Sequence, residues 1–179
     1  MTTQTRLMTL DEFLALPETK PYTELIDGVP CQKPVAKGPH SRAQWLLPSL
    51  LARDPATSAG SPWPELGFKF PRTSAGNLRV PDVSYYLPGH IDPLNPGDYP
   101  ERPPDLAAEI RSQGQTVRSL RERLAFLREQ GTRCTLLIDP EARTIEVHDG
   151  ARTWTASASD EVVLEQLNGF SFHVDELFS

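Results

Sequence analysis

Two acidic residues lie at the edges of apolar segments whose composition is typical of strands. Asp82 precedes the run Val83-Ser84-Tyr85-Tyr86-Leu87, and Glu109 interrupts the apolar residues 106–110. A carboxylate in a buried strand needs a partner, because an unpaired buried charge is costly. Mg²⁺ and Mn²⁺ bind one or two carboxylates together with a backbone carbonyl and waters. The residues alone leave two readings open, a cation site for phosphodiester cleavage and a pair of strand-end acids that face water.

Other charged residues could contribute to the same chemistry. Glu24 lies in a predicted strand and points away from the face of Thr23 and Leu25, so it is either a third acid of the site or a solvent-facing residue. His40 begins a predicted helix, where it is either structural or close to the acids. Arginines gather in the middle of the chain and indicate either a basic groove or a solvated helix face. They are Arg111, Arg118, Arg121, Arg123 and Arg128.

The N-terminal third should position Glu24. Thr9 and Glu12 have the spacing of a capping box and predict a short helix that Pro17 ends. Residues 22–26 form a predicted strand, and the Asp27-Gly28 turn returns the chain as a second strand over residues 29–35. Prolines in that second strand predict that it lies at a sheet edge.

The segments before and around Asp82 alternate between helix, strand and loop signals. Leucines at helical spacing predict a helix over residues 40–51, with a kink or an early end at Pro48. Residues 54–64 have the composition of a loop. Residues 65–70 and 78–83 predict two antiparallel strands joined by a turn at residues 73–77. A proline-rich loop over residues 88–104 then separates the two acids.

The segment after Glu109 predicts the topology of the sheet. An apolar stripe predicts a helix from about Thr116 to Gln130, with Gly131 as its C-terminal cap. This helix lies between strands predicted at residues 106–110 and 134–138, which implies parallel strands joined by a right-handed crossover. A hairpin around Asp149-Gly150 completes a mixed sheet. The class is α/β or α+β, in a single domain over residues 1–179.

Composition excludes several classes of protein. The net charge is −6 and the sequence pI is about 5.2, which argues against a protein that coats nucleic acid non-specifically. Two cysteines are too few for a disulfide framework. No apolar run has the length of a membrane span or a signal peptide, so we expect a cytoplasmic protein. The histidines lack zinc-site spacing, and neither a serine nucleophile elbow nor a glycine-rich phosphate loop is present.

Six short motifs follow one another over nearly the whole chain. They are Thr9-Leu10-Asp11-Glu12-Phe13-Leu14, Tyr22-Thr23-Glu24-Leu25-Ile26-Asp27-Gly28, His40-Ser41-Arg42, Arg79-Val80-Pro81-Asp82-Val83, Pro103-Pro104-Asp105-Leu106-Ala107-Ala108-Glu109-Ile110 and Leu137-Ile138-Asp139-Pro140. In the order and spacing of these motifs, the chain resembles the Uma-two restriction endonuclease family, a bacterial family within the PD-(D/E)XK nuclease superfamily.

The resemblance implies a restriction-endonuclease-like core, in which helices flank a mixed central sheet. It also implies that Asp82 and Glu109 bind Mg²⁺ or Mn²⁺, that the carbonyl of Ile110 is a further ligand, and that Glu24 contributes an acid. The implied activity is hydrolysis of DNA, in which the cation polarises the scissile phosphate and activates a water.

Two arginines depart from the family pattern. The superfamily has a lysine two residues after the second acid, where this chain has Arg111. The family instead carries a lysine on the following helix, where this chain has Arg123. Arginine keeps the positive charge but cannot act as a general base. Two hypotheses therefore remain: an endonuclease in which Arg123 or Arg111 replaces the lysine, and a catalytically inactive protein that binds nucleic acid or a protein partner, as a possible homodimer.

Overall fold

The computed structural model of the chain describes residues 6–71, 73 and 76–179, and their contacts group into two compact units. The larger unit contains Ala36–Leu66, Pro81–Pro93 and Arg102–Ser179. The smaller unit contains the described residues up to Val35 together with Gly67–Val80 and Leu94–Glu101. The single domain expected over residues 1–179 stays a prediction.

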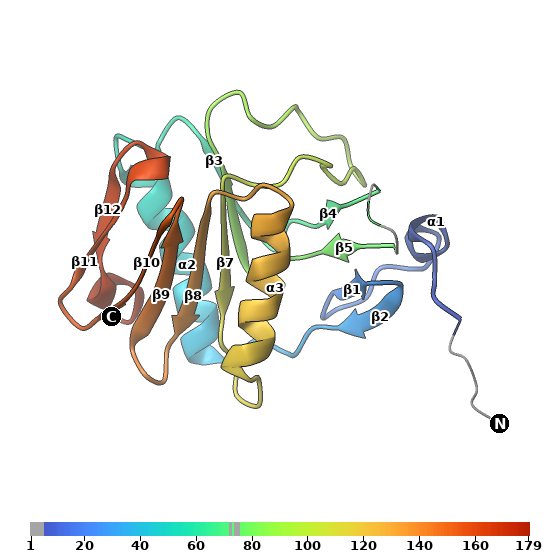
Figure 1. The fold of residues 1–179 in the computed structure, drawn as a ribbon, viewed down its shortest axis with the longest axis horizontal. Helices are drawn as coiled ribbons and strands as arrows, with labels where there is room; N and C mark the ends of the chain where they lie inside the picture. Colours follow the sequence, from blue (N-terminus) through green and yellow to red (C-terminus); the bar gives the residue numbers. More distant parts are fainter. Residues whose placement is uncertain (1–5, 72, 74–75) are drawn as a thin grey trace. The chain divides into compact units, whose positions relative to one another are not determined.

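A six-stranded sheet with the order β10-β9-β8-β7-β6-β3 forms the centre of the larger unit (Figure 1). β7 and β8 pair in parallel, whereas the other neighbours are antiparallel, so the sheet is mixed and the predicted class is confirmed. The strands are β3 (Ser61–Pro64), β6 (Val83–Tyr86), β7 (Leu106–Ile110), β8 (Cys134–Asp139), β9 (Thr144–Asp149) and β10 (Arg152–Ser157).

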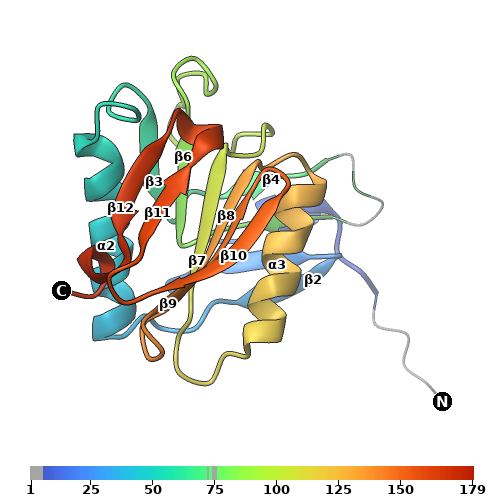
Figure 2. The same ribbon diagram turned by 60° about the vertical axis from the view of Figure 1, so that its left-hand side comes forward.

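Two helices cover opposite faces of this sheet, as Figures 1 and 2 show together. α2 (Gly38–Arg53) packs its buried leucines into the main core, and α3 (Val117–Glu129) crosses from β7 to β8 over the other face. The buried stripe of α3 consists of Leu120, Leu124 and Leu127. Gly131 follows the helix with φ +114°, a conformation that glycine adopts without steric cost, as predicted for a C-terminal cap.

α2 continues through Pro48, so the early end predicted at this residue is wrong. A proline inside a helix removes one hydrogen bond and costs about 3 kcal/mol. The helix bears this cost because Leu47, Leu50 and Leu51, on either side of the proline, are buried against the sheet. Tertiary packing therefore overrides the local signal.

β3 lies in the segment that was predicted to be a loop, and it forms one edge of the sheet. It pairs with β6 in a register that sets Pro64 opposite Val83, and the N–H of Glu65 continues the ladder by donating to the carbonyl of Asp82. Because inward bonding alternates along a strand, Pro62 and Pro64 occupy the outward positions. Prolines are tolerated there, since an outward N–H has no partner within the sheet.

The smaller unit contains a second sheet with the order β2-β1-β5-β4. Asp27 and Gly28 both have positive φ, which is the type I′ turn expected of this hairpin, and the capping box of α1 (Leu10–Leu14) is also confirmed. The turn predicted at residues 73–77 includes 74 and 75, which lie outside the described residues. The strands are β1 (Thr23–Ile26), β2 (Val29–Gln32), β4 (Phe68–Lys69) and β5 (Leu78–Arg79).

The C-terminal segment adds structure that the sequence did not reveal. β11 (Glu161–Leu164) and β12 (Phe170–His173) form a two-stranded sheet, flanked by the 3₁₀ helices η1 (Glu165–Leu167) and η2 (Val174–Leu177). Its apolar side chains complete the main core. Within the described residues, none of the helices has the length and apolar character needed to cross a membrane.

Candidate active site

The pairing of β6 with β7 brings the two predicted acids together. The ladder sets Val83 opposite Ala108; Asp82 immediately precedes Val83, and Glu109 immediately follows Ala108. Each of these side chains is only 3% exposed. The structure therefore places two buried carboxylates at this end of the ladder, Glu109 on β7 and Asp82 just before β6.

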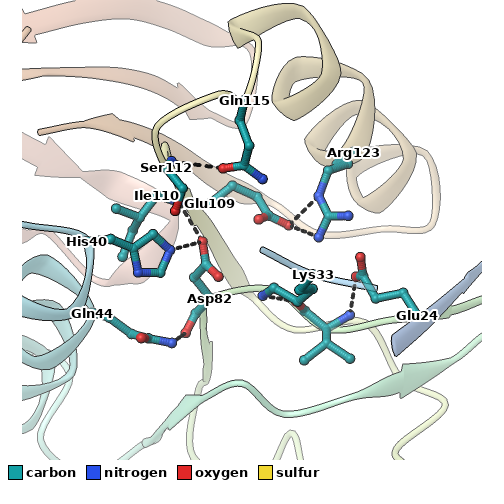
Figure 3. Close-up of polar contacts among 11 residues, drawn as sticks. Glu24, Lys33, His40, Gln44, Asp82, Glu109, Ile110, Ser112, Gln115 and Arg123 are labelled. Carbon is teal, nitrogen blue, oxygen red and sulfur yellow. Dashed lines mark hydrogen bonds and ion pairs between the residues drawn. The ribbon is translucent and has the colours of Figure 1, made fainter. Parts of the chain in front are cut away.

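Asp82 is held by groups from two other elements of the larger unit (Figure 3). Its Oδ2 accepts a hydrogen bond of 2.8 Å from the N–H of Ile110 and lies 3.1 Å from Nε2 of His40. An ionised carboxylate only accepts, so His40 donates through Nε2. Gln44 donates to the backbone carbonyl of Asp82 at 3.1 Å. Both the side chain and the backbone of Asp82 are thus fixed by the first turns of α2.

Glu109 forms an ion pair with Arg123 of α3. The Nε and Nη2 atoms of Arg123 lie 3.1 and 2.9 Å from Oε1 of Glu109. The side chain of Arg123 is 16% exposed, because the buried stripe of α3 turns this part of the helix toward β7. The guanidinium therefore balances the charge of the buried carboxylate and occupies the position that the family pattern gives to a lysine.

Arg111 does not join the two acids. Its Nη1 donates to Oδ2 of Asp139 at 2.7 Å, and its Nε donates to the carbonyl of Gln115 at 3.2 Å. β7 ends at Ile110, so the alternation that would return residue 111 to the side of Glu109 no longer applies. The hydrogen bond to Asp139 raises the pKa of Arg111. The catalytic role assigned to Arg111 stays a prediction that this geometry does not support.

The pair of Arg111 and Asp139 predicts part of the response of the protein to acid. Burial alone would raise the pKa of Asp139. Hydrogen bonds from Arg111 and from the N–H groups of Ala142 and Glu141 lower this pKa by more than burial raises it, so the net shift is downward. A depressed folded-state pKa stabilises the fold above the unfolded value, and this stabilisation is lost as pH falls below about 4. We expect Asp139→Asn to flatten the dependence of the unfolding free energy on pH between about 2 and 4.

Chemical denaturation at a series of pH values measures this effect. The matched control is Asp175→Asn, because Asp175 pairs with Arg143 on the surface, where both side chains are about half exposed. An acid dependence of Asp139→Asn that equals that of the parent protein would contradict the expectation.

Ile110 and Glu24 lie in different units. The side chain of Ile110 is buried in the main core, and the backbone N–H of this residue donates to Asp82. Glu24 belongs to β1 of the smaller unit, is 1% exposed, and accepts a hydrogen bond of 2.7 Å from the N–H of Val80. Lys33 donates to the carbonyl of the same Val80 at 2.7 Å. The predicted roles of the Ile110 carbonyl and of Glu24 at the site stay predictions.

Sequence reasoning gave His40 little weight and missed Gln44 altogether. These two residues lie four positions apart, so they share one face of α2, beside the buried Ala43 and Leu47. Their spacing beside an apolar stripe was the sequence signal that could have identified both as residues of the site. A polar pair of this kind on a core-facing helix needs buried polar partners, and Asp82 supplies both of them.

The donor set of the site agrees with a hard divalent cation. Asp82 and Glu109 offer carboxylate oxygens, and Mg²⁺ commonly uses one or two carboxylates and completes its coordination with waters. In the part of the chain that the structure describes, no three His, Cys, Asp or Glu side chains gather as a metal-binding cluster. Any cation would therefore depend on backbone carbonyls and waters in addition to the two acids.

Comparisons with known proteins identify a family and a similar solved structure. The family model Uma2, described as "Putative restriction endonuclease", matches residues 10–175. Among solved structures, "a putative nuclease belonging to DUF820 from Anabaena variabilis ATCC 29413" is similar, with 27% sequence identity and a TM-score of 0.80. The similarity covers 96% of this chain and 97% of that chain. A comparison with curated proteins finds no match.

Proposed function

Because the chain belongs to the Uma2 family of restriction endonucleases, we propose that it hydrolyses phosphodiester bonds of DNA with a divalent cation held by Asp82 and Glu109. One observation supports the proposal: two buried carboxylates flank the paired residues Val83 and Ala108, with Asp82 just before β6 and Glu109 on β7. Mg²⁺ or Mn²⁺ is the expected cation, with the carbonyl of Ile110 as a further ligand. When bound, the cation would polarise the scissile phosphate and activate a water.

The remaining residues of the site position these acids and supply charge. His40 and the N–H of Ile110 fix one oxygen of Asp82, so that its carboxylate is oriented before a cation arrives. Arg123 stays protonated at all relevant pH values, so it stabilises negative charge and does not act as a general base. We assign to Glu24 a contribution from the smaller unit, in line with its place in the family pattern.

One contact also favours a second candidate function. The guanidinium of Arg123 lies within 2.9 Å of Glu109 and already compensates the charge that a cation would compensate. A site neutralised in this way would suit a catalytically inactive protein that binds nucleic acid or a protein partner. The two candidates differ in whether the acids bind a cation.

Cleavage of supercoiled and single-stranded DNA, with Mg²⁺, with Mn²⁺ or with EDTA, tests the proposal. We expect nicking that requires the cation. The melting temperature should also rise with Mn²⁺, and this rise should disappear in Asp82→Ala. A melting curve that Mn²⁺ leaves unchanged, together with absent cleavage, would favour the inactive binding protein.

A further inference from the structure

A cavity of about 360 Å³ in the larger unit has no role in the reaction described above. It lies where α2 begins and where the chain leaves the parallel strands β7 and β8. His40 joins the cavity to the site, because it lines the cavity and also donates to Asp82. Other polar residues that line it are Lys37, Arg111, Ser112, Gln113, Asp139 and Glu141.

Two residues of the cavity wall carry buried polar atoms that lack a hydrogen-bond partner among the described residues. They are Oγ of Ser112 and Nδ1 of His40, in side chains that belong to residues only 6% and 7% exposed. A buried polar atom without a partner is costly, so most such atoms in folded proteins are satisfied by protein, water or ligand. Both atoms therefore indicate that a polar group enters this cavity.

The surrounding donors favour an anionic group. Lys37 donates to Oε1 of Gln113 at 2.7 Å, which uses one of the three N–H bonds of its ammonium group. Lys37 is also the N-cap of α2, and its side chain makes no capping hydrogen bond to the first turn. The start of a helix carries partial positive charge, and an uncapped first turn leaves backbone N–H groups for an anion.

Two acids also line the cavity, Asp139 and Glu141. Oδ2 of Asp139 is bound by Arg111, and its Oδ1 accepts from the N–H groups of Glu141 and Ala142. Asp139 thus accepts three hydrogen bonds. Glu141 is exposed, so solvent and salt screen the charge of its carboxylate. Arg111 uses its Nε and Nη1 in described hydrogen bonds, whereas its Nη2 makes none with the described residues. Ammonium, guanidinium and hydroxyl donors together match the oxygens of a phosphate group.

We infer that this cavity binds a backbone phosphate of the nucleic acid, next to the phosphate that is cleaved at Asp82 and Glu109. The inference rests on the proposed function, because it takes the same DNA as the ligand. Lys37 and Arg111 supply the charge and Ser112 supplies a hydrogen bond. His40 connects the phosphate subsite to Asp82, so a phosphate held there would place the adjacent nucleotide beside the acids.

Binding measurements without cleavage test the inference. Fluorescence anisotropy of a labelled DNA duplex in EDTA should show about tenfold weaker binding for Lys37→Met and a smaller loss for Ser112→Ala. The plot of log affinity against log salt should also become shallower by about 0.9 in Lys37→Met, since one phosphate contact is lost. Arg53→Met is the matched control, because this change removes the same charge from the exposed far end of α2.

A second arm uses inorganic phosphate and separates this inference from the proposed function. We expect phosphate to raise the melting temperature of the parent protein, and the rise to shrink in Lys37→Met and Ser112→Ala. If the parent binds DNA and both variants bind it equally well with the same salt slope, the subsite is overturned and the nuclease proposal stands. If the parent binds phosphate but no DNA, the phosphate subsite stands, whereas its assignment to nucleic acid and the proposed function both fail. If the parent binds neither phosphate nor DNA, the inference is overturned.

Discussion

Replacing Glu109 with Gln, or Asp82 with Asn, is expected to lower the rate of DNA cleavage by about two to three orders of magnitude. Both changes remove a negative charge from the proposed cation site and keep the shape of the side chain. Asparagine can still accept from the N–H of Ile110, and glutamine can still accept from Arg123, so the fold should persist. Nicking of supercoiled plasmid under single-turnover conditions with Mg²⁺ or Mn²⁺ measures the loss.

The chain offers a matched control in Glu146→Gln. Glu146 lies on β9 of the same sheet and pairs with Arg121 of α3 through contacts of 2.8 and 2.6 Å, so it is a second, more exposed Glu–Arg pair between the sheet and this helix. This variant should cleave DNA at the parent rate. Parent-like cleavage by Glu109→Gln and Asp82→Asn would instead show that the reaction uses other residues.

Replacing Arg123 with Met is expected to lower the unfolding free energy in EDTA by about 3 kcal/mol. The change takes the guanidinium away from Glu109, whose carboxylate stays buried. Mn²⁺ should restore much of this loss, because a cation bound by Glu109 compensates the same charge. Arg123→Lys should be more stable than Arg123→Met, because lysine keeps the positive charge. It should also cleave DNA faster than the parent, since lysine makes fewer hydrogen bonds to the Glu109 carboxylate and matches the family pattern. Denaturation with and without Mn²⁺, together with the nicking assay, measures these effects.

Two further variants make this expectation specific. Arg121→Met breaks the more exposed pair with Glu146 and should cost no more than about 1 kcal/mol. In a double-mutant cycle, Glu109→Gln should remove most of the cost of Arg123→Met, because the neutral amide needs no counter-charge. A stability of Arg123→Met that Mn²⁺ does not change would argue against a cation at Glu109.

Short sequence patterns were sufficient to predict the first hairpin turn and the helix α3. The Asp27-Gly28 turn needs positive φ at both positions, and the apolar stripe of α3 repeats at helical spacing, so both were readable from short segments. The parallel pairing of β7 with β8 followed from the helix between them. The apolar runs around Asp82 and Glu109 marked these acids, and the resemblance to a nuclease family then implied a cation site where the pairing of β6 and β7 brings them together.

The rest depended on contacts between distant segments. β3 contains two prolines in four residues, so its composition indicated a loop, and only pairing with β6 makes it a strand. The contacts of His40 and Gln44 with Asp82 join residues about forty positions apart, and the local spacing of the two residues on α2 does not identify Asp82 as their partner. The direction of Arg111 was also unreadable, because it depends on where β7 ends.

The prolines of β3 also bear on how two copies of the chain could assemble. Pro62 and Pro64 occupy the outward positions of this edge strand and have no N–H to donate, so the edge offers no donors at these positions to a strand from a second molecule. Growth of the sheet across this edge, whether into an ordered dimer or into an aggregate, is therefore disfavoured. A search for the homodimer that the second hypothesis allows should therefore begin with surfaces formed by side chains.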